Sequence, residues 1–464
     1  MDALILLAVL ICGLLPNRWI APAFPLIWVF ERLLPRDDQP PSPGGNIPPL
    51  LAHVGTIGLS PADLIIILLL VKLAVSLALN KELVIDRSLY LGLAFYLSAN
   101  LLASLGAGIK FGEAAFLRSL TSCARFVAEA LVIVIISQTI QTPAQAKRVL
   151  RILLGTLVLL AAIQFVNCFG AGHGFVIGEV QGLERGEPRY FGPVGDSVAM
   201  VLLLGYLVAL CFASVTGAAL FLGGILLTAG LGAVVATCVA TALFFFFGLR
   251  TIAVREFALR GLSLLALLAL ATLVSLSLST NSLDTTLLDR LTGDNYLDSG
   301  AQRGASGKLA AAMILDNPLL GVGYMGYERA LEQYGGDAYF DLQHPDGGTA
   351  NANNQILQAL TDGGIVGLLA FAVLITVAAR LFLRVATRSE DRFLSTYYLA
   401  AFLWLLTQVF GNLVAVWLTP ASFVARLLWV SLGVAVAVAR LLPVTQSSSA
   451  SSRRAPAEPE LLRA

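Results

Sequence analysis

Long apolar runs, separated by short polar stretches, make up most of this chain. Runs of membrane-spanning length recur near residues 62–80, 89–107, 120–139, 148–169, 195–213, 260–278, 355–379, 394–412 and 421–441. A helix needs about 20 consecutive apolar residues to cross the hydrocarbon core of a bilayer. The pattern therefore predicts an all-α fold, a polytopic membrane helix bundle.

Two regions change the expected number of helices. Residues 3–34 fit either one tilted helix or a short hairpin broken at Pro16. Residues 217–248 form an apolar stretch too long for one comfortable span, and Gly230 and Gly232 mark a tight reversal within it. With both regions included, we expect about 11 to 13 transmembrane helices.

Composition supports the membrane assignment. Hydrophobic residues make up 57% of the chain and charged residues only 13%, whereas a soluble protein has about 25% charged residues. The net charge of +1 does not bear on nucleic-acid binding, and the sequence has no basic patch with interleaved aromatics that would indicate a nucleic-acid partner. The five cysteines lie in apolar runs without the spacing of a metal site or a redox pair.

Basic residues orient the bundle, because short cytoplasmic loops carry an excess of Lys and Arg. Placing the basic clusters near 147–151, 250–260 and 380–392 in the cytoplasm requires two passes within 217–248. We then expect a transmembrane domain over residues 1–442, with a large external loop at about 279–353. Residues 443–464, rich in Ser, Ala, Arg and Pro, are predicted to be a disordered cytoplasmic tail.

Cations on the external side run against the excess of Lys and Arg in cytoplasmic loops. Three of them have the most informative surroundings: Arg189, Arg303 and Lys308. A guanidinium presents a rigid fork of donors that suits a phosphate or diphosphate. Arg189 precedes a Gly-Pro bend at the entrance to a helix, whose N-terminal amides would add to an anion site. The alternative for each residue is an ordinary solvated loop charge.

Glycine and proline divide the segment after Arg303. An amphipathic helix is predicted at about 304–316, ended by Asn317-Pro318. Gly321 and Gly323 then indicate a flexible turn.

Three polar residues farther along are candidates for chemistry. His344 could act as a general base, since an unperturbed imidazole titrates near neutral pH. Asn353 and Asn354 precede an apolar helix. Either they cap the helix, or they present amides to sugar hydroxyls.

Charges inside the apolar runs support a different class of function. Arg125 and Glu129 lie four residues apart, a spacing that places them on one helix face. They fit a buried structural ion pair or, alternatively, the site of a transporter.

Residues 303–367 resemble the signature of the O-antigen ligase/O-antigen polymerase family of bacterial polytopic membrane proteins. The resemblance rests on Arg303, on Pro-Leu-Leu-Gly-Val-Gly at 318–323, and on Asn-x-x-Leu-x-x-Leu-x-Asp-x-Gly-Ile-x-Gly at 354–367. Arg189 with Gly192 resembles the family's upstream external motif. Two departures stand out: Asn353 occupies the family's histidine position, and the stretch LTAGLGAV at 227–234 lacks an arginine that the family often carries.

The resemblance implies a multi-pass inner-membrane glycosyltransferase that uses a glycan on polyprenyl diphosphate to build surface polysaccharide, either O-antigen or exopolysaccharide. It implies no metal and no cofactor. Its other implied partners are membrane lipid, a flippase and a chain-length regulator. The expected catalytic residues are Arg303, Asn353, Asn354 and His344, and the expected substrate-binding residues are Arg189, Arg303, Lys308, Gly321 and Gly323.

Loss of the imidazole at position 353 favours a polymerase. The alternatives are a ligase that transfers the glycan to a lipid or protein acceptor, a transporter or flippase for a lipid-linked or polar substrate, and an inactive relative that serves as an assembly partner.

Overall fold

The structure is a computed structural model that describes residues 15–33, 61–79, 85–170, 177, 179–181, 189–192, 197–228, 231–248, 294–334, 351–410, 416–419 and 422–442. Over these residues the fold is all-α, as predicted, apart from one short antiparallel ribbon of β1 (Glu179–Gln181) and β2 (Arg189–Gly192). The apolar run at 260–278 and the tail at 443–464 lie outside the described residues.

Helices follow the predicted apolar runs closely. In chain order they are α2 (Asn17–Ile20), η1 (Ala21–Ala23), α3 (Phe24–Leu33), α4 (Pro61–Ala78), α5 (Arg87–Phe111), α6 (Glu113–Ala130), α7 (Val132–Thr139), α8 (Pro143–Gly170), α9 (Val198–Cys211), α10 (Val215–Leu227), α11 (Leu231–Gly248), α14 (Asp294–Asp316), α15 (Tyr327–Ala330), η5 (Leu331–Tyr334), α17 (Gln355–Arg388), α18 (Arg392–Phe410) and α19 (Phe423–Leu441).

Five stretches in the described part of the chain are long and apolar enough to cross a membrane: Arg87–Phe111, Glu113–Thr139, Pro143–Cys168, Gln355–Arg388 and Phe423–Leu441. Shorter apolar helices accompany them, α9 and α10 included. The protein is thus a multi-pass membrane protein.

The predicted break within 217–248 is confirmed. Helix α10 ends at Leu227 and α11 begins at Leu231, on either side of Gly230. In the N-terminal region, α2 begins at Asn17, directly after the predicted break at Pro16, and α3 follows from Phe24.

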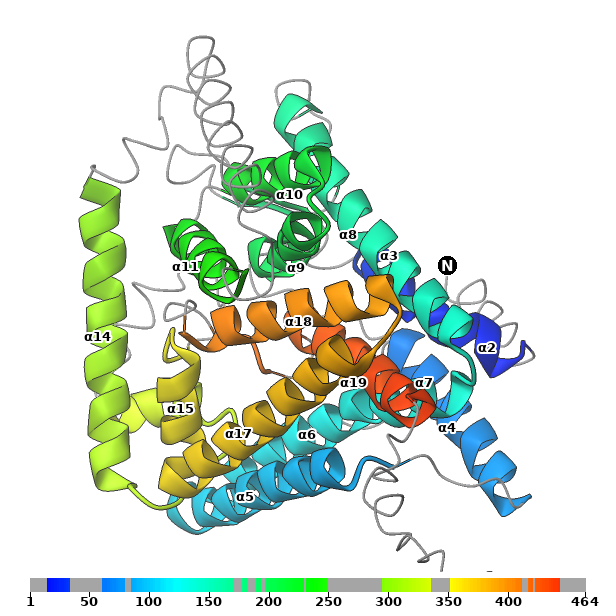
Figure 1. The fold of residues 1–464 in the computed structure, drawn as a ribbon. Helices are drawn as coiled ribbons and strands as arrows, with labels where there is room; N and C mark the ends of the chain where they lie inside the picture. Colours follow the sequence, from blue (N-terminus) through cyan, green and yellow to red (C-terminus); the bar gives the residue numbers. More distant parts are fainter. Residues whose placement is uncertain are drawn as a thin grey trace, which may run out of the picture.

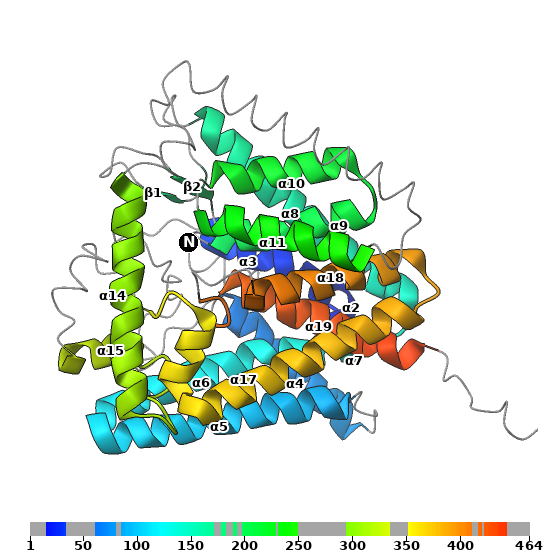
Figure 2. The same ribbon diagram turned by 60° about the vertical axis from the view of Figure 1, so that its left-hand side comes forward.

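The helices form two groups, with α18 and α19 between them (Figures 1 and 2). Helices α5, α6 and α17 run side by side in one group, and α8 to α11 form the other. Helix α14 stands along one edge of the bundle in both views. Helix α19 is buried over almost its whole length and is the central element of the core.

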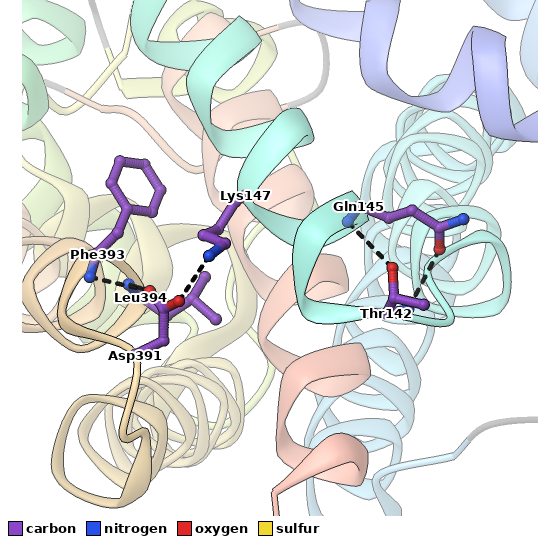
Figure 3. Close-up of polar contacts among 6 residues, drawn as sticks. All are labelled: Thr142, Gln145, Lys147, Asp391, Phe393 and Leu394. Atoms are coloured by element: carbon purple, nitrogen blue, oxygen red, sulfur yellow. Dashed lines mark hydrogen bonds and ion pairs between the residues drawn. The ribbon is translucent and has the colours of Figure 1, made fainter.

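Polar contacts tie the helices together at the end predicted to face the cytoplasm. Lys147 at the start of α8 donates to Asp391 Oδ2 at 2.7 Å, and Asp391 Oδ1 also accepts the main-chain N–H of Phe393 at 3.0 Å (Figure 3). Arg440 of α19 donates to the carbonyl of Ile140 at 3.0 Å. Lys147, one of the basic residues that set the predicted orientation, therefore also links α8 to the start of α18, and Arg440 links α19 to the end of α7.

Candidate functional site

The centre of the candidate site is a break in α17, where the backbone leaves the helical conformation at Gly364 (φ 60°, ψ −157°). A break deprives the next amides of their helical partners, and such groups must be satisfied by other protein atoms at membrane depth. The turn at 318–326 supplies those partners. Ile365 N–H donates to Pro318 O at 2.9 Å, and Val366 N–H donates to Leu319 O at 3.4 Å.

Carbonyl groups on the other side of the break are bound by the same turn. Val322 N–H donates to Thr361 O at 2.8 Å, and Gly323 N–H donates to Asp362 O at 3.0 Å. The turn and the broken helix are therefore joined by four main-chain hydrogen bonds. The turn predicted at Gly321 and Gly323 is present, and these bonds hold it against α17.

Glycine is required on both sides of this contact. Gly321 has φ +66°, and a Cβ there would collide with the carbonyl oxygen of Thr361. A Cβ on Gly364 would collide with the carbonyl group of Leu319. Gly323 also has a positive φ, at +98°. Gly321 and Gly323 thus allow close backbone packing, which is what the structure shows for these two predicted substrate-binding residues.

Tyr324 anchors the turn in the apolar core. Its ring packs edge-on against Phe126 of α6 with centroids 6.2 Å apart, and against Tyr96 of α5 at 6.5 Å. Phe126 in turn contacts Trp429 of α19 at 5.3 Å. The turn is therefore held by α5, α6 and α17, and α19 packs behind Phe126.

The segment 351–354 leads from the predicted external loop into α17. Asn354 is the N-cap, and its Oδ1 accepts the N–H groups of Ile356 at 2.8 Å and Leu357 at 3.1 Å. This confirms the capping interpretation for Asn354. Asn351 Oδ1 accepts the N–H of Asn353 at 2.8 Å.

Asn353 differs from its two neighbours. Its backbone is left-handed, with φ +51°, a conformation in which Asn, Asp and His are enriched among non-glycine residues. Within the described part of the chain its carboxamide has no hydrogen-bond partner, and the residue is partly exposed. Asn353 thus presents a donor and an acceptor that the fold does not use.

A buried polar chain connects this segment to the turn. Gln358 Oε1 accepts the N–H of Ala352 at 2.9 Å, and Gln358 Nε2 donates to Asp362 Oδ1 at 2.8 Å. The main-chain N–H groups of Met325 and Gly326 also interact with the Asp362 carboxylate. We call Gln358 and Asp362 the polar strut, because together they span the distance from 352 to the turn.

Helix α14 is attached to the same region through Ser306. Ser306 Oγ donates to Asn351 O at 2.9 Å and lies 3.1 Å from Tyr327 Oη. Arg303 lies one helical turn before Ser306, and Lys308 lies two residues after it with an exposed side chain. In sequence, the two predicted cations of α14 therefore lie within three residues of Ser306, where α14 contacts the 351–354 segment.

The predicted bounds of this helix need correction at one end. It ends at Asp316, as the Asn317-Pro318 pair predicts, but it begins at Asp294, earlier than the predicted 304. At its end, Lys110 of α5 donates to Asn317 Oδ1 at 2.7 Å.

A second group of cations lies beside α15. Burial lowers the pKa of the Arg329 guanidinium, the like charge of Arg118 lowers it further, and Glu328 opposes both. The Nε of Arg329 is buried and has no hydrogen-bond partner among the described residues. Nothing in the sequence indicated that Arg118 of α6 would lie near this predicted external cation.

Arg189 and His344 are the remaining predicted residues. Arg189 begins β2 and is paired with Gln181 of β1, so it stands on a strand, and helix α9 begins later, at Val198. His344 lies outside the described residues. The described residues hold no group of three or more His, Cys, Asp or Glu suited to a metal ion.

The buried charges have an unexpected arrangement. Glu129 Oε1 lies 3.0 Å from Arg426 Nη2 of α19, with side-chain exposures of 6% and 1%, and the Arg426 guanidinium stacks 5.2 Å from the ring of Trp28. The spacing in the sequence had indicated Arg125 as the partner of Glu129. Arg426 stands in the apolar run at 421–441, and its charge within that run was the signal that could have identified it.

Comparison with protein families supports the resemblance found in the sequence. Residues 216–372 match the family model described as O-Antigen ligase. No curated protein matches the chain. The matched range contains α10, α11, α14, the turn at 318–326 and the break in α17, so the resemblance to the O-antigen ligase/polymerase family is confirmed over the residues that build the site.

Proposed function

We propose, from the O-antigen ligase match over residues 216–372, that this chain is an inner-membrane glycosyltransferase that polymerises glycan units carried on polyprenyl diphosphate. The match itself supports a membrane function in surface glycan biosynthesis, with a lipid-linked glycan as substrate. The observation that supports the proposed glycosyl transfer is the polar surface at the start of α17. There Asn353 has an unused carboxamide next to the point where α14, with Arg303 and Lys308, is attached.

In the proposed reaction an acceptor hydroxyl attacks the anomeric carbon of the donor. A new C–O bond forms as the bond from that carbon to the diphosphate oxygen breaks, and polyprenyl diphosphate leaves with the electron pair. Arg303, Arg189 and Lys308 would stabilise the charge that develops on the leaving group. In this scheme the cationic side chains, in place of a metal ion, would neutralise the diphosphate.

The proton of the acceptor hydroxyl must go to a base. A carboxamide cannot take it, so Asn353 is proposed to orient the acceptor by hydrogen bonding, next to the cap residue Asn354. His344 is the proposed base, since its imidazole accepts a proton near neutral pH. This division of roles differs from one in which a single histidine at 353 would do both.

A transporter is the competing class, and broken helices are typical of transporters because their ends coordinate substrate or ions. Here the freed amides of Ile365 and Val366 are bound to the carbonyls of Pro318 and Leu319. The break in α17 is thus satisfied by protein, which favours a structural use of the break and a catalytic use of the polar surface beside it.

A test uses purified protein in detergent with a lipid-linked oligosaccharide and no membrane gradient. A polymerase gives a ladder of products, and Arg303→Ala abolishes it, while Arg388→Ala at the other end of α17 leaves the ladder intact. A single addition to a lipid or protein acceptor would indicate the ligase. Unchanged ladders in Arg303→Ala would refute the assignment of Arg303.

A further inference from the structure

We propose that Asp362 and Gln358, the polar strut, are positioning residues that set the orientation of Asn353 for transfer. This inference rests on the proposed function, since it gives Asn353 a role toward the acceptor. Neither strut residue is placed to touch substrate: their side chains are buried, with 3% and 2% exposure. Their effect would act through the backbone of residues 352 and 353.

The first step is the orientation of the Gln358 amide. Its oxygen accepts from Ala352 N–H at 2.9 Å, and its nitrogen donates to Asp362 Oδ1 at 2.8 Å. If the amide were reversed, its nitrogen would face an N–H group and its oxygen would face a carboxylate. Asp362 Oδ1 is the acceptor for the Gln358 amide nitrogen, so Asp362 fixes which way Gln358 faces.

The second step is the set of hydrogen bonds that the Asp362 carboxylate accepts. Its carboxylate receives the Gln358 amide on one side and interacts with the main-chain N–H groups of Met325 and Gly326. Gly326 N–H also donates to Gly323 O at 2.8 Å, but the Gln358 amide and Met325 N–H depend on this carboxylate, and buried donors without an acceptor are costly. Asparagine has one acceptor oxygen, so it cannot satisfy both sides in the way that aspartate does.

The third step is the backbone at the two ends of the strut. Among the described residues other than glycine, only Ala213, Met325 and Asn353 have positive φ. Met325 (φ 55°) lies at one end of the strut and Asn353 (φ 51°) at the other. Such conformations persist where the surroundings determine them, and they occur often at functional sites.

These three steps give a physical reason for the residue at 353. The position requires a residue that accepts a left-handed backbone and carries a polar ring or amide, and both Asn and His meet this requirement. Because Ala352 N–H is held by Gln358 and Asn353 N–H by Asn351, the main chain that leads into position 353 is fixed. The strut thereby fixes the direction in which position 353 presents its side chain.

The test begins with Asp362→Asn and a readout that needs no activity. Hydrogen exchange of the 351–354 amides should accelerate about tenfold, the effect of losing one buried hydrogen bond. Gln355→Leu is the matched control. Gln355 lies on the same turn with 4% exposure, and its Oε1 accepts the N–H groups of Trp417 and Leu418 at 2.8 Å. It should lower Tm without changing exchange at 351–354.

The second readout is kinetic. Asp362→Asn should lower kcat by about 100-fold, the effect of misplacing a reacting group by about 1 Å, with KM for the lipid-linked donor unchanged. The double variant Gln358→Glu with Asp362→Asn restores the pattern of donors and acceptors, because the carboxylate introduced at position 358 would accept from both Ala352 N–H and the new amide. It should recover both exchange protection and kcat.

Three results would overturn the proposal: unchanged exchange in Asp362→Asn, accelerated exchange with unchanged kcat, or a loss of kcat in Gln355→Leu equal to that in Asp362→Asn. Failure of the proposed function looks different. In that case the wild-type protein would transfer no glycan, while the exchange measurement would still decide whether the strut holds residues 351–354.

Discussion

Replacing Gly364 by alanine tests the central feature of the structure, the break in α17. Gly364 has φ 60° and ψ −157°, a region that is essentially restricted to glycine and costs other residues about 1–3 kcal/mol. Its added Cβ would also collide with the backbone of Leu319 and Leu320. To relieve that collision, the turn at 318–326 must move away from α17.

The size of the effect follows from what the movement breaks. The hydrogen bonds from Ile365 to Pro318 and from Val366 to Leu319 would each contribute about 1 kcal/mol. Added to the backbone term, the free energy of unfolding should fall by about 3–5 kcal/mol. We expect a clearly lower Tm for the purified protein in detergent.

The adjacent glycine provides the control. A Cβ on Gly363 would meet only Asn100 Oδ1, at 3.8 Å, which is an ordinary contact, and Gly363 is not among the glycines with positive φ. Gly363→Ala should therefore leave Tm unchanged or raise it slightly, since alanine favours a helix over glycine. Equal Tm values for Gly363→Ala and Gly364→Ala would refute the reasoning about the break.

Two further predictions concern charges. Glu129→Gln leaves the buried guanidinium of Arg426 without its carboxylate and should lower the free energy of unfolding by about 3–5 kcal/mol. Replacing both residues by leucine should recover much of that loss. Thermal unfolding measures both effects, and a double variant that is less stable than Glu129→Gln would contradict the prediction. The hydrogen bond from Lys147 holds the pKa of Asp391 below its ordinary value, so the stabilisation from this pair is complete above the unfolded pKa of about 4 and is lost as pH falls through the lower folded pKa. Because both side chains are 29% exposed, the pair contributes less than about 1 kcal/mol. The small Tm difference between wild type and Asp391→Asn should therefore disappear on acidification. A Tm difference that persists in acid would show that the stabilisation does not come from this ion pair.

Much of the bundle could be predicted because membrane insertion depends on local composition. The spans, the break between α10 and α11, the end of α14 at Asp316 and the capping role of Asn354 all follow from residues within a few positions of one another. The same is true of the family motifs, which are short and contiguous.

The parts that could not be predicted depend on contacts between distant segments. The turn at 318–326 and the residues around Gly364 form main-chain hydrogen bonds, and glycines alone do not reveal which backbone they approach. The pairing of Arg189 with Gln181 in a β-ribbon and the proximity of Arg118 to Arg329 are of the same kind. The left-handed backbone at Asn353 likewise depends on Asn351 and Gln358, so it follows from the assembled site.

The ion pair between Glu129 and Arg426 has a consequence for the order in which the protein is made. Its two residues are 297 positions apart, so Glu129 enters the bilayer long before its partner is synthesised. An arginine in an inserting helix costs up to about 3 kcal/mol at the helix centre and less toward its ends. Arg426 lies in the first turn of α19, and a carboxylate already in the membrane offsets its cost. We therefore expect α19 to insert beside a carboxylate that the first half of the chain has already placed in the membrane, and its insertion completes the bundle.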